Sequence, residues 1–232
     1  LMDDVAPEAQ VIAGRFAAPL ELGLQSASRI SDRFSPDGMM ALRGLVQQVQ
    51  ALDLRQVLVD DIPAEISNLL RQVTGFAGLI HENMYRSDGW RFLSLGVSLE
   101  RAANMCGVLA ASTIDDAPAG ALDLALEIAD SVVSHRARFQ ISANRASVID
   151  LLGLDLQNPR SVRYHISRTK EHIAHLPQQD KGHVLSEVAR LVLMAETKLA
   201  TSRPNEITPE YLFQMRQDIW DISTALNDHH LV

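Results

Sequence analysis

Apolar residues recur along this chain of 232 residues at the three- and four-residue spacing of amphipathic α-helices. Residues 61–86 show the pattern most clearly, because eight apolar positions fall on one stripe: Ile66, Leu69, Leu70, Val73, Phe76, Ala77, Ile80 and Met84. Alternating runs of Val, Ile and Thr with polar residues, which are typical of strands, are essentially absent. The pattern predicts an all-α helical bundle of about nine helices with no significant sheet.

Prolines and capping residues predict where these helices begin. Ser35-Pro36-Asp37 and Thr208-Pro209-Glu210 each place a hydroxyl at the N-cap and proline at the first helical position. Pro19 should kink or divide the first helix. The expected helices run over about 7–34, 35–54, 61–86, 90–112, 119–141, 144–152, 158–176, 180–202 and 208–229. With no linker between them, they predict a single domain over residues 1–232.

Charge and composition exclude several classes of function. The net charge is −8 and no long basic run occurs, so binding to nucleic acid or to an anionic membrane is not expected. The longest charge-free stretch, Ala102 to Ile114, is too short to span a bilayer. No signal-peptide pattern opens the chain, and Cys106 is its only cysteine. The sequence therefore favours a cytoplasmic protein.

Two glutamates stand out because their neighbours on the helical wheel have almost no side chain. These neighbours are Gly75 and Gly78 beside Glu82, and Gly96, Ala103 and Gly107 beside Glu100. Another helix or a ligand could approach such faces closely. We expect both carboxylates to face the interior and each to contact an arginine, because a buried charge needs a partner.

These glutamates allow two interpretations. They are either members of structural ion pairs, which we prefer, or a general acid–base pair, which makes them the candidate catalytic residues. A groove that carries both charge types could also hold a peptide or a carboxylate. The candidate groove residues are Glu82, Asn83, Arg86, Asp88, Trp90, Arg91, Glu100, Arg101, Arg136 and Arg138.

Motifs for metals, cofactors and phosphate are missing from the sequence. No Glu-x-x-His or His-Glu-x-x-His pattern occurs, and His165, His172 and His175 on one helix are best interpreted as structural or surface residues. No glycine-rich phosphate loop or serine-nucleophile motif is present. We expect no metal and no cofactor. We also do not expect this chain alone to hydrolyse ATP or to catalyse a ligation reaction.

Residues 89–102, Gly-Trp-Arg-Phe-Leu-Ser-Leu-Gly-Val-Ser-Leu-Glu-Arg-Ala, resemble the signature of the alpha-E family. These are all-helical bacterial proteins of uncertain function. Residues 82–86, 155–161 and 29–36 resemble further motifs of that family, and the resemblance spans about residues 18–177. Family members usually begin with another helical segment that carries its own Trp, Gly and Glu-Arg-Ala pattern. Without that copy, this chain resembles the later two-thirds of an alpha-E domain.

The resemblance implies a functional context. Alpha-E proteins resemble accessory components of systems that contain a permuted ATP-grasp ligase and a transglutaminase-like protein, and such systems make peptide amide bonds. We therefore expect a non-catalytic binding or scaffolding component, with the ATP-grasp ligase or the transglutaminase-like protein as its partner. The alternatives are a stand-alone enzyme that acts on a peptide or amide through the Glu/Arg groove, and a structural dimerisation module that forms a homo-oligomer.

Overall fold

The computed structural model describes residues 6–51, 61–176 and 185–230, and over these ranges it contains ten α-helices and no strand. The prediction of an all-α fold is confirmed. The chain divides into two compact units, Leu1–Ser87 and Asp88–Val232. The single domain over residues 1–232 stays a prediction. Within the described ranges, no helix combines the length and the apolar character that a membrane crossing requires.

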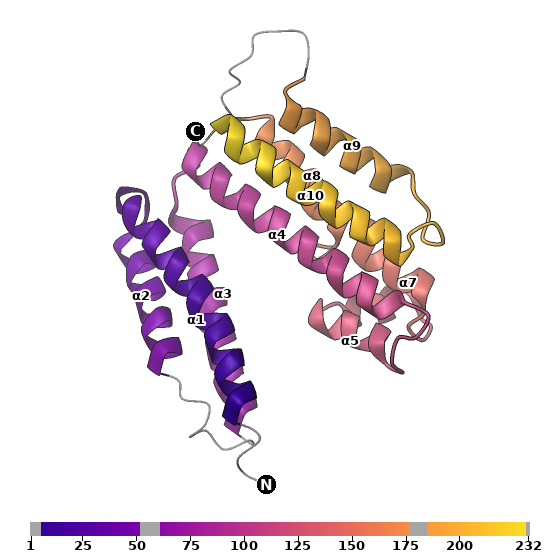
Figure 1. Ribbon diagram of the computed structural model, residues 1–232, viewed down its shortest axis with the longest axis horizontal. Helices are drawn as coiled ribbons and strands as arrows, with labels where there is room; N and C mark the ends of the chain where they lie inside the picture. The colour runs from indigo at the N-terminus through magenta and orange to yellow at the C-terminus, as the bar shows by residue number, and fades with distance from the viewer. Residues whose placement is uncertain (1–5, 52–60, 177–184, 231–232) are drawn as a thin grey trace. The chain divides into compact units, whose positions relative to one another are not determined.

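The first unit is a small three-helix assembly. It consists of α1 (Ala6–Arg29), a 3₁₀ turn (Ser31–Arg33), α2 (Pro36–Ala51) and α3 (Ile62–Asn83). Helix α2 packs against both α1 and α3 (Figure 1). A small buried cluster holds it to its neighbours: Ala27, Met39 and Leu42, with Leu24, Phe34 and Phe76 at its edge.

Local sequence signals explain how these helices begin. The Ser35 hydroxyl accepts a hydrogen bond from the Gly38 amide at 3.1 Å, which confirms the predicted N-cap of α2. Pro19 lies inside α1, which continues through it as one helix. The expected end of the second helix, at residue 54, lies outside the described residues.

The second unit is built around one long helix. Its elements are α4 (Asp88–Thr113), α5 (Ala121–Ile128), α6 (Val132–Phe139), α7 (Arg145–Ile149), a π-helical turn (Asp150–Leu154), α8 (Val162–Ile173), α9 (Glu187–Thr201) and α10 (Pro209–His230). Helix α4 packs against α8, α10 and α5 (Figure 1). It therefore contributes the largest share of the core, including Leu95, Leu99, Ala102, Cys106 and Leu109.

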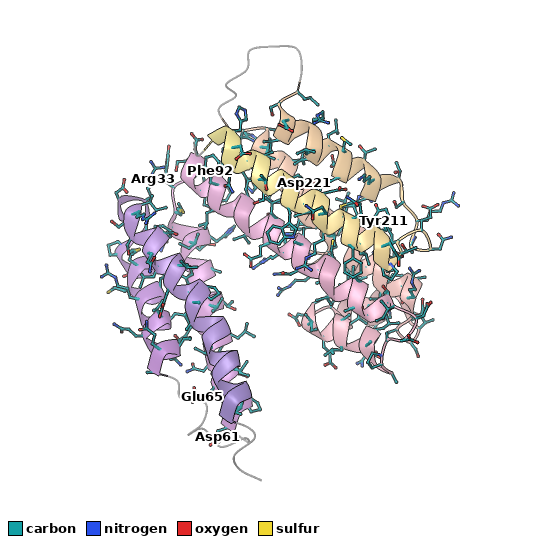
Figure 2. The ribbon with its side chains drawn as sticks, viewed as in Figure 1. Arg33, Asp61, Glu65, Phe92, Tyr211 and Asp221 are labelled. Atoms are coloured by element: carbon teal, nitrogen blue, oxygen red, sulfur yellow. The ribbon has the colours of Figure 1, made fainter. Side chains whose placement is uncertain are left out.

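Polar contacts fasten α10 to α9 beside this core. Tyr211 lies on α10 (Figure 2), and its hydroxyl is 3.1 Å from that of Ser202. The Lys198 ammonium lies 2.6 Å from the Asp218 carboxylate. The Thr208 hydroxyl accepts a hydrogen bond from the Tyr211 amide, as the predicted N-cap of α10 requires.

The expected helix over residues 119–141 is wrong, because the chain forms two short helices there. Asp130 takes a left-handed conformation with φ of 48° and ends α5. The Ser131 amide then donates to the Leu126 carbonyl at 2.8 Å, which is the six-to-one bond of a Schellman cap. Aspartate tolerates this conformation better than most residues do.

The motif at residues 155–161 is a structural turn. The helix expected to begin at residue 158 is capped by Ser161 and not by Asn158. The Ser161 hydroxyl accepts a hydrogen bond from the Tyr164 amide at 3.0 Å. Asn158 is buried, and its side-chain amide donates to the Leu151 carbonyl at 3.1 Å. The expected start of the next helix, at residue 180, lies outside the described residues.

Candidate functional site

Helices α4 and α8 enclose two buried histidines. His165 and His172 are seven residues apart, two turns of α8, and therefore share one face. Each is only 4% exposed. The His172 ring meets the indole of Trp90 on α4 edge to face, with ring centroids 5.0 Å apart and planes at 77°. The two imidazoles thus lie along the contact between the two helices.

The positive charges of nearby arginines affect the pKa values of these imidazoles. Burial is the main cause that lowers the pKa of His165 to about 4, and the positive charges of Arg101 and Arg160 lower it further. A backbone hydrogen bond at Pro159 acts in the opposite direction. At pH 7 the His165 imidazole is therefore neutral, and the charges of two arginines contribute to this.

His172 has the same electrostatic character. Burial again comes first among the causes that lower its pKa to about 4, followed by the charges of Arg168 and Arg91. The Glu171 carboxylate acts in the opposite direction. We call the set Arg91, Arg101, Arg160, His165 and His172 the arginine–histidine cluster.

Three arginines of this cluster have no carboxylate partner among the described residues. Arg168 forms an ion pair with Glu171 at 2.7 Å, but within the described ranges Arg91, Arg101 and Arg160 form no ion pair with a carboxylate. Arg91 is half-buried and the other two are exposed. Guanidinium groups bind carboxylates and phosphates in a bidentate manner. On a chain of net charge −8, these arginines are a local concentration of positive charge.

The lowered pKa values of the histidines predict a dependence of stability on pH. Between pH 6.5 and about 4 the unfolded chain binds more protons than the folded chain, because both imidazoles lose basicity on folding. Their contribution to stability is therefore complete above pH 6.5 and is lost as the pH falls toward 4. Urea unfolding across this range should show a smaller pH slope for His165→Gln than for the wild type. An unchanged slope in the variant would contradict the lowered pKa.

Three of the predicted groove residues join this cluster or its edge: Trp90, Arg91 and Arg101, all on α4. Two others lie elsewhere in the same unit, on α6. Arg136 is exposed, and Arg138 forms ion pairs with Asp150, at 3.0 Å, and with Asp155. Three of the ten predicted residues therefore lie in or beside the arginine–histidine cluster, and two lie on another helix.

Four further candidates lie at or before the start of α4. Glu82 and Asn83 are exposed at the end of α3 in the first unit. Arg86 donates a hydrogen bond to the His81 carbonyl. Asp88 is exposed as the first residue of α4.

The prediction that Glu82 and Glu100 face the interior against arginines is wrong. Both side chains are exposed, and within the described residues neither forms an ion pair. Three of the glycines beside them point outward as well, because a Cβ added at Gly75, Gly78 or Gly96 would meet no atom within 4 Å. Ala103, by contrast, is buried. The larger apolar face of each helix takes the buried side instead.

The sequence analysis interpreted His165 and His172 only as structural or surface residues. Their seven-residue spacing was the available signal, but their arginine neighbours on α4 come together with them only in the folded chain. In the part of the chain that is described, no group of three or more His, Cys, Asp or Glu side chains is placed to hold a metal ion.

Comparison with known proteins gives one family and uncharacterised relatives. Residues 16–231 match the Alpha-E model, described as a predicted alpha-helical domain with a conserved ER motif. The chain is 28% identical over 217 residues to an uncharacterized protein of Mycobacterium bovis, covering 88% of this chain and 24% of the relative. A Mycobacterium tuberculosis relative, also uncharacterized, is 27% identical over 213 residues, covering 87% of this chain and 23% of its own length.

The chain thus spans about a quarter of the length of these relatives. No solved structure matches it. Its only Glu-Arg dipeptide is Glu100-Arg101, on α4, and the arginine of that pair is part of the arginine–histidine cluster. With the match extending over nearly all of its length, the chain belongs to the Alpha-E family.

Proposed function

We propose that this protein is a non-catalytic binding component of an ATP-grasp-linked system that forms peptide or amide bonds. The observation that carries the proposal is the arginine–histidine cluster. Its two imidazoles are buried and neutral, and its three arginines, which form no ion pair within the described residues, act on them through their positive charge. The cluster supplies fixed positive charge and hydrogen-bonding groups for an anionic group on a partner or a substrate.

The family supplies the context for that anion. Amide ligation joins a carboxylate to an amine, so a carboxylate is a group that such a system must hold. Arginine is suited to this task because its planar guanidinium matches the two carboxylate oxygens. The partner in this proposal is an ATP-grasp ligase or a transglutaminase-like protein, and the location is the cytoplasm, where ATP is made and used.

The observations favour a binding role over an independent acid–base enzyme. The two glutamates that the enzyme hypothesis requires are both exposed and belong to different compact units. Acid–base catalysis by carboxylates usually depends on a desolvated or charged environment that adjusts their pKa. The cluster on α4 and α8 is instead rich in cations, whose role is to hold and orient an anion.

Affinity purification from the native cell tests this proposal. The wild-type chain and the double variant Arg91→Glu with Arg101→Glu serve as baits, and mass spectrometry identifies the bound proteins. We expect an ATP-grasp protein to copurify with the wild type and to be lost from the double variant. Charge reversal at two cluster positions replaces attraction of an anion by repulsion.

A matched control distinguishes the effect of changing the cluster from the effect of changing the net charge. Arg29→Glu with Arg203→Glu makes the same change in charge at two exposed arginines that lie outside the cluster. This control should retain the ATP-grasp protein. Equal loss from both variants, or no ATP-grasp protein with the wild type, would contradict the proposal.

A further inference from the structure

A second region of α4 lies beside an arginine of α10 that forms no ion pair among the described residues. Arg216 on α10 lies beside Gly107 on α4, where an added Cβ would be 3.8 Å from the guanidinium Nη1. Its Nε is buried without a hydrogen-bond partner. Within the described residues, Arg216 forms no ion pair. The absence of a counterion is costly for a half-buried guanidinium, so this group is suited to receive a carboxylate.

Glu100 lies on the same side of α4. It precedes Gly107 by seven residues, which places the two on one face about two helical turns apart. Its side chain is exposed and also forms no ion pair among the described residues. Helices α4 and α10 therefore contribute one exposed carboxylate and one half-buried guanidinium that form no ion pair within the described residues.

Helix α10 also carries two exposed aromatic residues near Arg216. Trp220 is 47% exposed and lies one helical turn beyond Arg216, and Phe213 is 57% exposed about one turn before it. Figure 1 shows α4 and α10 side by side and running in opposite directions. Because the two helices are antiparallel, Trp220 lies closer than Arg216 does to the part of α4 that contains Glu100. Exposed tryptophans of this kind often anchor protein interfaces.

We propose that this face binds the same face of a second copy of the chain. A two-fold axis brings each unpaired group of one copy to its opposite in the other, so Glu100 of one chain meets Arg216 of the second, and the reverse pair forms at the same time. One acid and one base on a single face are self-complementary in this way. Trp220 adds apolar area between the two pairs.

Sedimentation equilibrium of the purified chain tests this dimer. The wild type should be dimeric at about 100 µM, and Glu100→Arg should weaken the dimer at least about tenfold, because it sets two pairs of like charges against each other. Glu127→Arg makes the same change at an exposed position on α5 and should leave the dimer intact. Circular dichroism checks that each variant is folded.

Mixing two variants distinguishes this geometry from any other self-association. Glu100→Arg alone and Arg216→Glu alone should both associate at least about tenfold more weakly than the wild type, whereas their mixture should form a heterodimer with both ion pairs restored. A monomeric wild type, an unaffected Glu100→Arg dimer, or folded variants that do not associate on mixing would each overturn the proposal. These experiments leave Arg91 and Arg101 unchanged, so their failure would not bear on the arginine–histidine cluster.

Discussion

Leu109→Ala is expected to lower the free energy of unfolding by about 3 kcal/mol, within the usual range for fully buried leucines. Leu109 is 0% exposed and lies in the last third of the long helix α4, which packs against α5, α8 and α10. The truncation removes apolar contacts and leaves a cavity that rigid neighbouring helices can close only in part. Urea denaturation at neutral pH measures the loss.

The matched control is Leu124→Ala on α5, a position that is 55% exposed. Because its side chain is already largely in water, the change should cost no more than about 0.5 kcal/mol. Similar losses for the two variants would show that α4 does not form the centre of the core.

Reversal of two charges in the arginine–histidine cluster is expected to weaken the binding of an anion at least about 100-fold. The probe is a tri-glutamate peptide, which offers several carboxylates, and isothermal titration calorimetry at low ionic strength compares the wild type with Arg91→Glu plus Arg101→Glu. Each charge-assisted hydrogen bond contributes about 1.5–3 kcal/mol, so the loss of two accounts for the factor. Added salt should weaken wild-type binding as well.

The double variant Arg29→Glu with Arg203→Glu again provides the control. Both arginines are exposed and lie outside the cluster, so binding of tri-glutamate should change less than about threefold through net charge alone. An equal loss in both double variants would mean that the peptide responds to overall charge and that the cluster is not its site.

The sequence was sufficient to predict the fold class and several helix starts. Ser35 and Thr208 cap α2 and α10 as expected, because a hydroxyl before a proline satisfies amides of the first helical turn. The interruption at Asp130 was not predictable from periodicity, since the apolar pattern continues across it. A single left-handed residue changes the direction of the chain without a strong sequence signal.

The helical wheel grouped Glu100 with small residues, but that strip does not face the core as a whole, because Ala103 is buried whereas Glu100 is exposed. Gly96 shares its outward direction, whereas Leu95, Leu99 and Ala102 form the buried side. A row of glycines permits close packing but does not require it. Burial follows the larger apolar area, which stabilises the fold more per helical turn.

The candidate site shows a different limit of sequence reasoning. Arg101 belongs to a motif that is visible in the sequence, but its neighbour His165 comes from a helix that lies far along the chain. Only the packing of α4 against α8 brings the two together. Charge pairing within one helix can be inferred from spacing, whereas pairing between helices requires the tertiary fold.

Titration of the imidazole signals of His165 and His172 by nuclear magnetic resonance tests the central claim most directly. Tri-glutamate peptide is added to the wild-type chain, and the pKa of each histidine is followed from its imidazole shifts. An anion held by the cluster stabilises the protonated imidazoles, so both pKa values should rise from about 4 when the peptide binds. His81, exposed on α3 in the first unit, should not respond. Unchanged shifts of His165 and His172 at saturating peptide would contradict an anion site between α4 and α8.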